Sequence, residues 1–135
     1  MSDNSKKTIQ NTIAQLVEDY KEYNAICEAD GDGSHYEDYE KAEKIVERMQ
    51  ERPLSCEVRS SWENTGVELV ADEFKILLGS GGPAYWIAGS LDEHGEPSDV
   101  KAFHQDWFEP AQDIYLVGPA LDAVEWFAGL FYWGR

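Results

Sequence analysis

The chain has 135 residues and carries 27 Asp and Glu against 11 Lys and Arg, which leaves a formal net charge of −16. A charge of magnitude about 2–8 already keeps a small domain soluble. Phosphate contacts need clustered Lys and Arg, so this balance argues against direct binding of nucleic acid or of an anionic membrane. The apolar content of 42% and the aromatic content of 13% are too high for a disordered acidic tail.

The length fits a single domain, residues 1–135, with a core of its own. No apolar run approaches the roughly 20 residues of a membrane span. The N-terminal residues lack the apolar stretch of a signal peptide, so we expect a cytoplasmic location. In that compartment Cys27 and Cys56 are expected to be reduced and partly buried, without a disulfide.

Apolar residues recur at helical spacing in the first third of the chain and predict two helices. The first runs from Thr8 to about Ile26 and ends before the turn-rich segment 30–35. The second runs from about Tyr36 to Arg52, and Pro53 marks its end. Residues 1–53 are therefore predicted to form an acidic helical hairpin.

The pattern of residues 54–135 predicts a sheet and a closing helix. Alternating or continuous apolar residues indicate strands over 56–61, 74–78, 84–91 and 100–107, and glycine-rich or acidic turns separate most of them. Short strands with local turns favour an antiparallel meander of three to four strands. Pro119 suits the first turn of a helix that continues to about Trp133, whereas 108–118 receive no assignment. The predicted fold class is α+β, with the last helix packed on the sheet.

Segment 30–41 has the length of a calcium-binding EF-hand loop. Asp30, Asp32 and Asp38 stand at ligand positions, but His35 replaces the turn glycine and Lys41 replaces the bidentate acid. An acidic connection between helices is the better interpretation.

Two further patterns are candidates for chemical sites. His94, His104 and Asp106 can be read as metal ligands or as an acid–base pair, but no third ligand follows at a suitable spacing. A hydrogen-bonded histidine at a sheet surface is the commoner outcome. The glycine-rich segment 79–84 lacks the Gly-Lys-Ser/Thr of a phosphate-binding loop. We therefore predict no catalytic residue, no metal and no cofactor.

The acids form two belts along the sequence. The first belt spans residues 18–40 and the second spans residues 92–113, and each contains a single lysine within its acidic run, Lys21 and Lys101 respectively. The acids predicted to contact a partner are Glu28, Asp30, Asp32, Glu37, Asp38, Glu40, Asp92, Glu93, Glu96, Asp106 and Glu109. Surplus aromatic residues near these acids suit contacts with the arginines of a basic partner.

From Leu54 onward the chain resembles a family of small acidic proteins encoded by bacteriophages and prophages, which have no assigned role. The resembling segments are 54–62, 73–78, 81–84, 91–97, 105–108 and 131–134. The resemblance implies a phage origin and brings no catalytic residue with it. Family members often carry an aromatic-rich Trp-Thr stretch after Gln-Asp-Trp, and residues 109–113 depart from that pattern. Small acidic phage proteins often neutralise bacterial defence systems, including restriction and CRISPR systems.

The leading hypothesis is a non-enzymatic inhibitor that binds a host nucleic-acid-handling protein, a CRISPR effector or a restriction enzyme, through an acidic surface that mimics nucleic acid. The alternative is a phage adaptor protein inside the cell whose charge serves only solubility. A third class, a metal-dependent enzyme, would use His104 and Asp106. The sequence identifies neither the target nor the oligomeric state.

Overall fold

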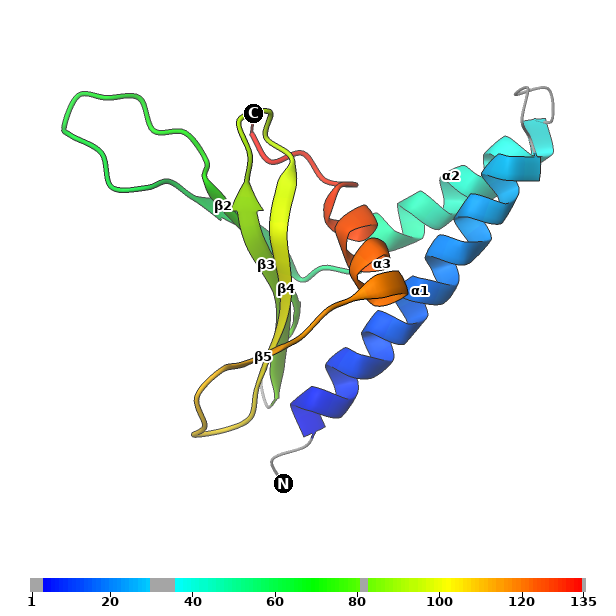
Figure 1. Cartoon of the computed structure of the whole chain (residues 1–135), viewed down its shortest axis with the longest axis horizontal. Coiled ribbons are helices and arrows are strands. Elements are labelled where there is room, and N and C mark those ends of the chain that lie inside the picture. The colour runs from blue at the N-terminus through cyan, green and yellow to red at the C-terminus, as the bar shows by residue number, and fades with distance from the viewer. Residues whose placement is uncertain (1–3, 30–35, 81–82, 135) are drawn as a thin grey trace.

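The chain folds into an α+β domain whose elements follow one another in simple order. The structure is a computed structural model and describes residues 4–29, 36–80 and 83–134. Two N-terminal helices precede an antiparallel sheet, and a third helix closes the chain (Figure 1). The elements are α1 Asn4–Ala29, α2 Tyr36–Gln50, β1 Ser55–Arg59, β2 Glu73–Gly79, β3 Ala84–Leu91, β4 Pro97–Gln105, β5 Gln112–Ile114 and α3 Gly118–Ala128.

The sheet is a meander of five strands in the order β1-β2-β3-β4-β5, and every neighbouring pair is antiparallel. The predicted class and meander are confirmed, but the sheet has one strand more than the three to four expected. The additional strand β5 lies in the segment 108–118 that received no assignment. Its three residues are too few for a periodic pattern, and pairing with residues 102–104 of β4 defines it.

The core lies between one face of the sheet and the helices α1 and α3. Alternation in β4 places Val100, Ala102 and His104 on one face, and all three are buried. The first half of α1 packs against this face through Ile9 and other apolar residues, so the hairpin joins the core. The outer half of α1 extends beyond the sheet with α2 beside it (Figure 1).

Two helix boundaries differ from the predictions for tertiary reasons. α1 begins at Asn4 rather than Thr8, because a carboxylate oxygen of Asp106 accepts a hydrogen bond from the Ser5 backbone N–H at its first turn. α3 ends at Ala128 rather than near Trp133. The chain turns there and the Trp133 indole donates to the Ala128 carbonyl at 3.0 Å, placing the ring in the core.

The segment predicted as an acidic loop over 92–98 is shorter than expected. Pro97 and Ser98 already belong to β4 and pair with Leu91 and Ser90 of β3. Pro97 can begin this strand because the first residue of a strand need not donate to the ladder.

Candidate interaction surface

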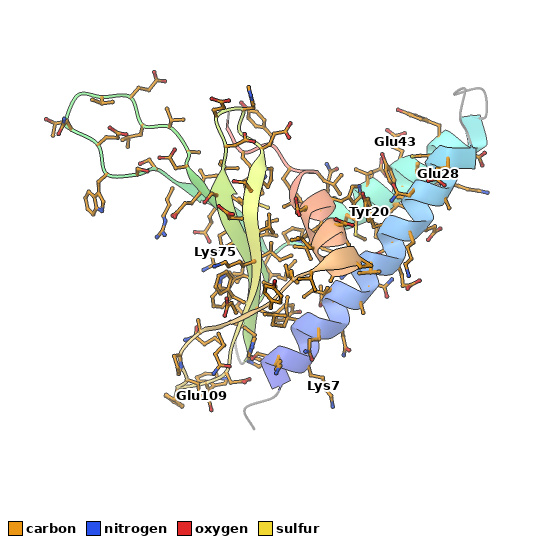
Figure 2. The ribbon with its side chains drawn as sticks, viewed as in Figure 1. Lys7, Tyr20, Glu28, Glu43, Lys75 and Glu109 are labelled. Atoms are coloured by element: carbon orange, nitrogen blue, oxygen red, sulfur yellow. The ribbon has the colours of Figure 1, made fainter. Side chains whose placement is uncertain are left out.

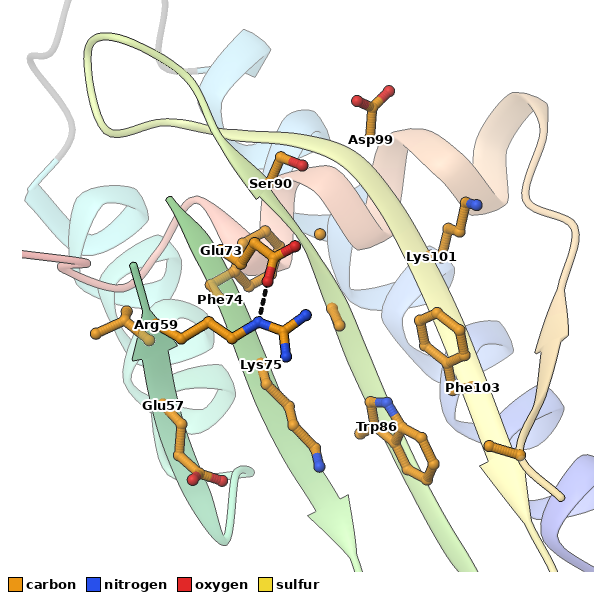
Figure 3. A pocket seen from close by; sticks show the side chains of 14 residues that line it. Glu57, Arg59, Glu73, Phe74, Lys75, Trp86, Ser90, Asp99, Lys101 and Phe103 are labelled. Carbon is orange, nitrogen blue, oxygen red and sulfur yellow. Dashed lines mark hydrogen bonds and ion pairs between the residues drawn. The ribbon is translucent and has the colours of Figure 1, made fainter. Parts of the chain in front are cut away.

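The face of the sheet opposite the helices is open, and it forms a shallow groove of about 540 Å³ (Figure 3). In one cross-strand row Lys75 of β2, Ala88 of β3 and Lys101 of β4 lie side by side. In the next row Trp86 pairs with Phe103, and their rings stack with centroids 5.6 Å apart. The Lys75 ammonium lies 4.8 Å from the centroid of the Trp86 ring, a cation–π contact.

Charges of both signs border this groove. Arg59 forms an ion pair with Glu73, and that hydrogen bond raises the pKa of the guanidinium (Figure 3). The lining contains three bases and three acids, which are Arg59, Lys75, Lys101, Glu57, Glu73 and Asp99. The groove is therefore locally balanced in an acidic protein, with an aromatic centre.

Residues 60–72, which we name the arm, leave the sheet between β1 and β2 and project away from the body (Figure 1). The arm is closed at its base, where the Asp72 carboxylate accepts from the Ser61 N–H at 2.8 Å and the Asp72 N–H donates to the Arg59 carbonyl at 2.9 Å. Its exposed apolar side chains are Trp62, Val67, Leu69 and Val70. This exposed tryptophan is not identified from the sequence, because the strand predicted over 56–61 ends before it and residues 63–72 receive no assignment.

The loop between β4 and β5 presents a second exposed aromatic group. Trp107 and Phe108 are 62% and 99% exposed, and their ring centroids lie 5.8 Å apart. Phe108 has a φ of 62°, a region that non-glycine residues seldom occupy. The Gln105 amide holds this loop by donating to the Glu109 carbonyl at 2.8 Å.

The first acidic belt lies on the helical hairpin. Glu28, Asp38 and Glu40 lie near its tip, where α1 ends and α2 begins (Figure 2). Asp30, Asp32 and the side chain of Glu37 lie outside the residues that the structure describes, as does most of the tested calcium-binding segment.

One acid assigned to the first belt is not on the surface. Asp19 is buried between the helices, and its carboxylate pairs with Arg48 at 2.9 Å and with Arg52 at 3.8 Å. Glu18 is exposed and pairs with Lys21 at 3.8 Å. The prediction that this belt faces only Lys21 was wrong, since α2 supplies Arg48 and the segment after it supplies Arg52, which a reading of neighbouring residues cannot find.

The second belt is divided between the two ends of the sheet. Asp92, Glu93 and Glu96 lie in the turn between β3 and β4, whereas Asp106 and Glu109 follow the far end of β4. The nine residues of β4 separate these groups by about 30 Å. Sequence neighbours within one belt therefore form two clusters.

Two of these acids also accept hydrogen bonds from backbone N–H groups. Asp92 Oδ1 accepts from the His94 and Glu96 N–H groups at 2.8 and 2.9 Å and so closes the turn. The Asp106 carboxylate accepts from the Ser5 N–H at 3.1 Å, at the start of α1. Both acids are structural as well as negatively charged.

His104 is hydrogen-bonded as expected but is buried rather than at the sheet surface. Its Nδ1 lies 3.0 Å from the Ser5 hydroxyl, which is also fully buried, although 99 residues separate the two in the chain. This contact is not predicted from the sequence, because α1 brings the Ser5 hydroxyl to His104 from the other end of the chain. Asp106 contacts the Ser5 backbone rather than the imidazole, so the three groups fasten α1 to β4. His94 lies apart from them, exposed beside Glu93. Within the described ranges no group of three or more His, Cys, Asp or Glu could hold a metal ion.

Both cysteines are free and exposed, so the expectation that they are partly buried was wrong. Cys56 lies on β1 at the sheet edge, where neighbouring groups partly desolvate the thiol and raise its pKa. Cys27 lies near Tyr23 on α1. Burial is the largest cause that raises the pKa of the Tyr23 hydroxyl. The charge of Cys27 and a hydrogen bond to Cys27 raise this pKa further.

Comparisons with protein-family models, curated proteins and solved structures give no match for this chain. The resemblance to small phage proteins therefore stays a prediction. In the described part of the chain, no helix is both long enough and apolar enough to cross a membrane.

Proposed function

We propose that this chain is a non-enzymatic protein that binds a basic, nucleic-acid-handling partner through acids on its sheet side. The observation that carries the proposal is the distribution of charge. Residues 51–134 hold 15 acids against four bases, a net charge of −11, whereas the hairpin residues 4–50 hold 11 acids against six bases, a net charge of −5. A cationic groove attracts such a surface at long range and accelerates association.

The spacing of the acids along the sheet favours mimicry of single-stranded nucleic acid over mimicry of a duplex. Seven acids lie in residues 92–113, along and beyond the roughly 30 Å of β4. Over that length duplex DNA carries about 18 phosphates, and one of its strands carries about nine. The number of acids matches the single strand more closely.

Aromatic side chains beside the acids supply the contact area that charge alone lacks. Trp107 and Phe108 are exposed in the same loop as Asp106 and Glu109. An arginine of the partner can pair with a carboxylate there and stack on a ring. Exposed aromatic and arginine pairs of this kind dominate the binding energy of many interfaces.

The specific partner we propose is a host-defence protein, a CRISPR effector or a restriction enzyme. This part of the proposal rests on the resemblance of residues 54–134 to small acidic phage proteins. Both kinds of partner have cationic grooves for nucleic acid, which is the surface that the acids would occupy.

Capture from a bacterial lysate, followed by titration with an oligonucleotide and with salt, tests the proposal. We expect the captured protein to be released by nucleic acid and by rising ionic strength. Binding that neither nucleic acid nor salt weakens would reject mimicry.

Two charge-reversal variants of equal net change locate the interface. Glu93→Lys with Glu96→Lys and Glu109→Lys alters the sheet side and leaves the structural Asp92 and Asp106 intact. The control reverses three acids at the hairpin tip, Glu28→Lys, Asp38→Lys and Glu40→Lys. We expect the first set to weaken binding at least about tenfold more than the control. Both variants change the net charge equally, so the long-range attraction to the partner changes equally in both. A larger loss with the tip variant would contradict the sheet-side location.

An adaptor role is the second candidate, and the arm favours it. Its side chains Trp62 and Leu69 are apolar and fully or largely exposed, and the neighbouring groove is balanced in charge. Unchanged partner binding in both charge-reversal variants would support this role and reject mimicry.

A further inference from the structure

We infer that two copies of this chain pair through strand β1, antiparallel and centred on Val58, so that the two sheets form one continuous sheet. β1 lies at the end of the strand order and is paired with β2 alone. Four of its five residues, 56 to 59, are exposed. An unpaired strand edge of this kind is a template for another strand.

Several devices that usually protect an edge strand are missing from β1, although its five residues include the charged Glu57 and Arg59. Its sequence, Ser55–Arg59, contains neither lysine nor proline, and its register with β2 has no bulge. The opposite edge differs, because β5 has only three residues and so offers little backbone to a partner. The geometry therefore points to β1 rather than β5 as the pairing edge.

The side chains along this edge separate by face. Val58 lies in β1, and Leu54 and Trp62 flank the strand at positions that an extended chain would place on the same side as Val58. The exposed fractions of Leu54, Val58 and Trp62 are 63%, 50% and 102%. Glu57 and Arg59 lie on the other side, within the open groove. A monomer thus leaves three large apolar side chains in water along one edge.

A pairing centred on Val58 matches every one of these side chains. Val58 then faces Val58 of the second copy, and Glu57 faces its Arg59 while Arg59 faces its Glu57. Leu54 faces Trp62 of the second copy, which buries both. The two-fold symmetry makes each contact twice, as an isologous interface requires. Opposite charges and apolar groups in directly opposed positions stabilise antiparallel pairs.

Other registers place like charges opposite each other or bring together sides of different character. Centring on Glu57 would place two glutamates opposite each other, and centring on Arg59 would oppose two arginines. A shift by one residue would set the apolar side of one strand against the charged side of the other. Among the registers near the middle of β1, the one centred on Val58 is self-complementary.

Sedimentation of the whole chain at about 150 mM salt, over about 1 μM to about 1 mM protein, tests the inference. We expect the mass to rise with concentration from 15.3 kDa to twice that value. Val58→Lys should abolish the rise, because two ammonium groups would meet at the symmetry axis. The matched control is Val67→Lys in the arm, where the valine is also 50% exposed. A monomer at every concentration, or an equal effect of both substitutions, would overturn the inference.

Cross-linking tests the register independently of any folding defect in the lysine variant. In a background of Cys27→Ser and Cys56→Ser, Val58→Cys places two thiols across the axis at a distance suited to a disulfide. Under mild oxidation we expect it to form covalent dimers at least about tenfold faster than Val67→Cys. Equal rates would show that the disulfides form by random collision and would overturn the pairing. Circular dichroism confirms that both variants are folded.

Discussion

At the scale of single residues, Asp19 shows how a buried charge is accommodated. It is the only acid among the described residues that is buried, and Arg48 and Arg52 of the second helical segment approach it from one side. Only the Arg48 contact, at 2.9 Å, has hydrogen-bonding geometry, and Asp19 Oδ2 accepts no hydrogen bond. The ion pairs join the two helical segments, and the charges of the arginines compensate the buried carboxylate.

This geometry predicts unequal roles for the two arginines. Arg48→Ala should lower the free energy of unfolding by about 1.5–3 kcal/mol, because a buried carboxylate loses its charged hydrogen-bond donor. Arg52→Ala, at the longer distance of 3.8 Å, should cost less than half as much. Urea denaturation of both variants measures the difference, and equal losses would contradict the assignment.

Gly89 marks the closest backbone approach in the centre of the sheet. A Cβ atom there would lie 2.7 Å from the Ser98 carbonyl oxygen of the neighbouring strand, which is too close for any ordinary contact. This position falls where the register between β3 and β4 shifts, between Ala88 and Ser90. The glycine is required by space rather than by a positive φ.

Gly89→Ala should therefore lower the unfolding free energy by about 1–3 kcal/mol through overpacking. Gly129→Ala is the matched control, since Gly129 has a φ of −74° and a Cβ there makes only ordinary contacts, at 3.4 Å or more. The control should be neutral or stabilising by up to about 1 kcal/mol. Thermal unfolding of the two variants measures this difference. If Gly89→Ala left the unfolding free energy unchanged, the strands could separate at no cost, which would contradict the prediction.

At the scale of elements, the start of α1 depends on side chains from β4. Ser5 and His104 are both buried and hydrogen-bonded to each other, and Asp106 accepts from the first turn of the helix. These contacts connect residues about 100 positions apart. They account for a helix that begins four residues before its apolar repeat does.

Ser5→Ala should lower the unfolding free energy by about 1–3 kcal/mol, because the buried imidazole nitrogen loses its partner. Amide hydrogen exchange in the first two turns of α1 should accelerate more than exchange in β3, since the loss is local. Ser80→Ala, at an exposed serine, is the control and should change stability by less than about 0.5 kcal/mol. Uniform acceleration throughout the chain would contradict a local fastening role.

At the scale of the whole molecule, self-repulsion is the dominant electrostatic term. The formal charge is −16, and few acids in the described ranges have a basic partner within ion-pair distance. Repulsion among the remaining acids opposes the compact state and is screened by salt. The acids that favour association with a cationic groove therefore cost folding stability.

Sodium chloride should consequently stabilise this protein. Raising the ionic strength from about 10 mM to about 500 mM shortens the screening length from about 30 Å to below about 5 Å. We expect Tm to rise by about 3–6 °C, which corresponds to roughly 1 kcal/mol for a domain of this size. The triple variant of Glu93, Glu96 and Glu109 to Lys has a net charge of −10, because each substitution adds two positive units to −16, and should respond less. A Tm that falls with salt would contradict dominant repulsion.

Local patterns predicted most of the fold. The strand over Ala84–Leu91 has the predicted bounds, and the helical hairpin and closing helix lie where spacing placed them. Alternation in β4 also follows the sequence, but which of its two faces is buried was not predicted, and His104 lies on the buried one. Side-chain periodicity is a property of neighbours along the chain, so one dimension suffices to read it.

The candidate surface was far less accessible to sequence reasoning. Asp92 and Asp106 belong to one acidic run in the sequence, yet β4 places them at opposite ends of the sheet. Asp19 is in an acidic run too, but the packing of α2 buries it. The open groove with Trp86, the meeting of Ser5 with His104 and the free edge of β1 arise from strand order and helix docking.

Composition and periodicity are encoded residue by residue, so they were enough to predict that an acidic, aromatic-rich chain folds as an α+β meander. The clustering of the acids, their neutralisation by basic groups and the unpaired sheet edge emerge only in the folded chain. Electrostatic potential and contact depend on distances in space, and those distances are set by how the strands order and the helices pack.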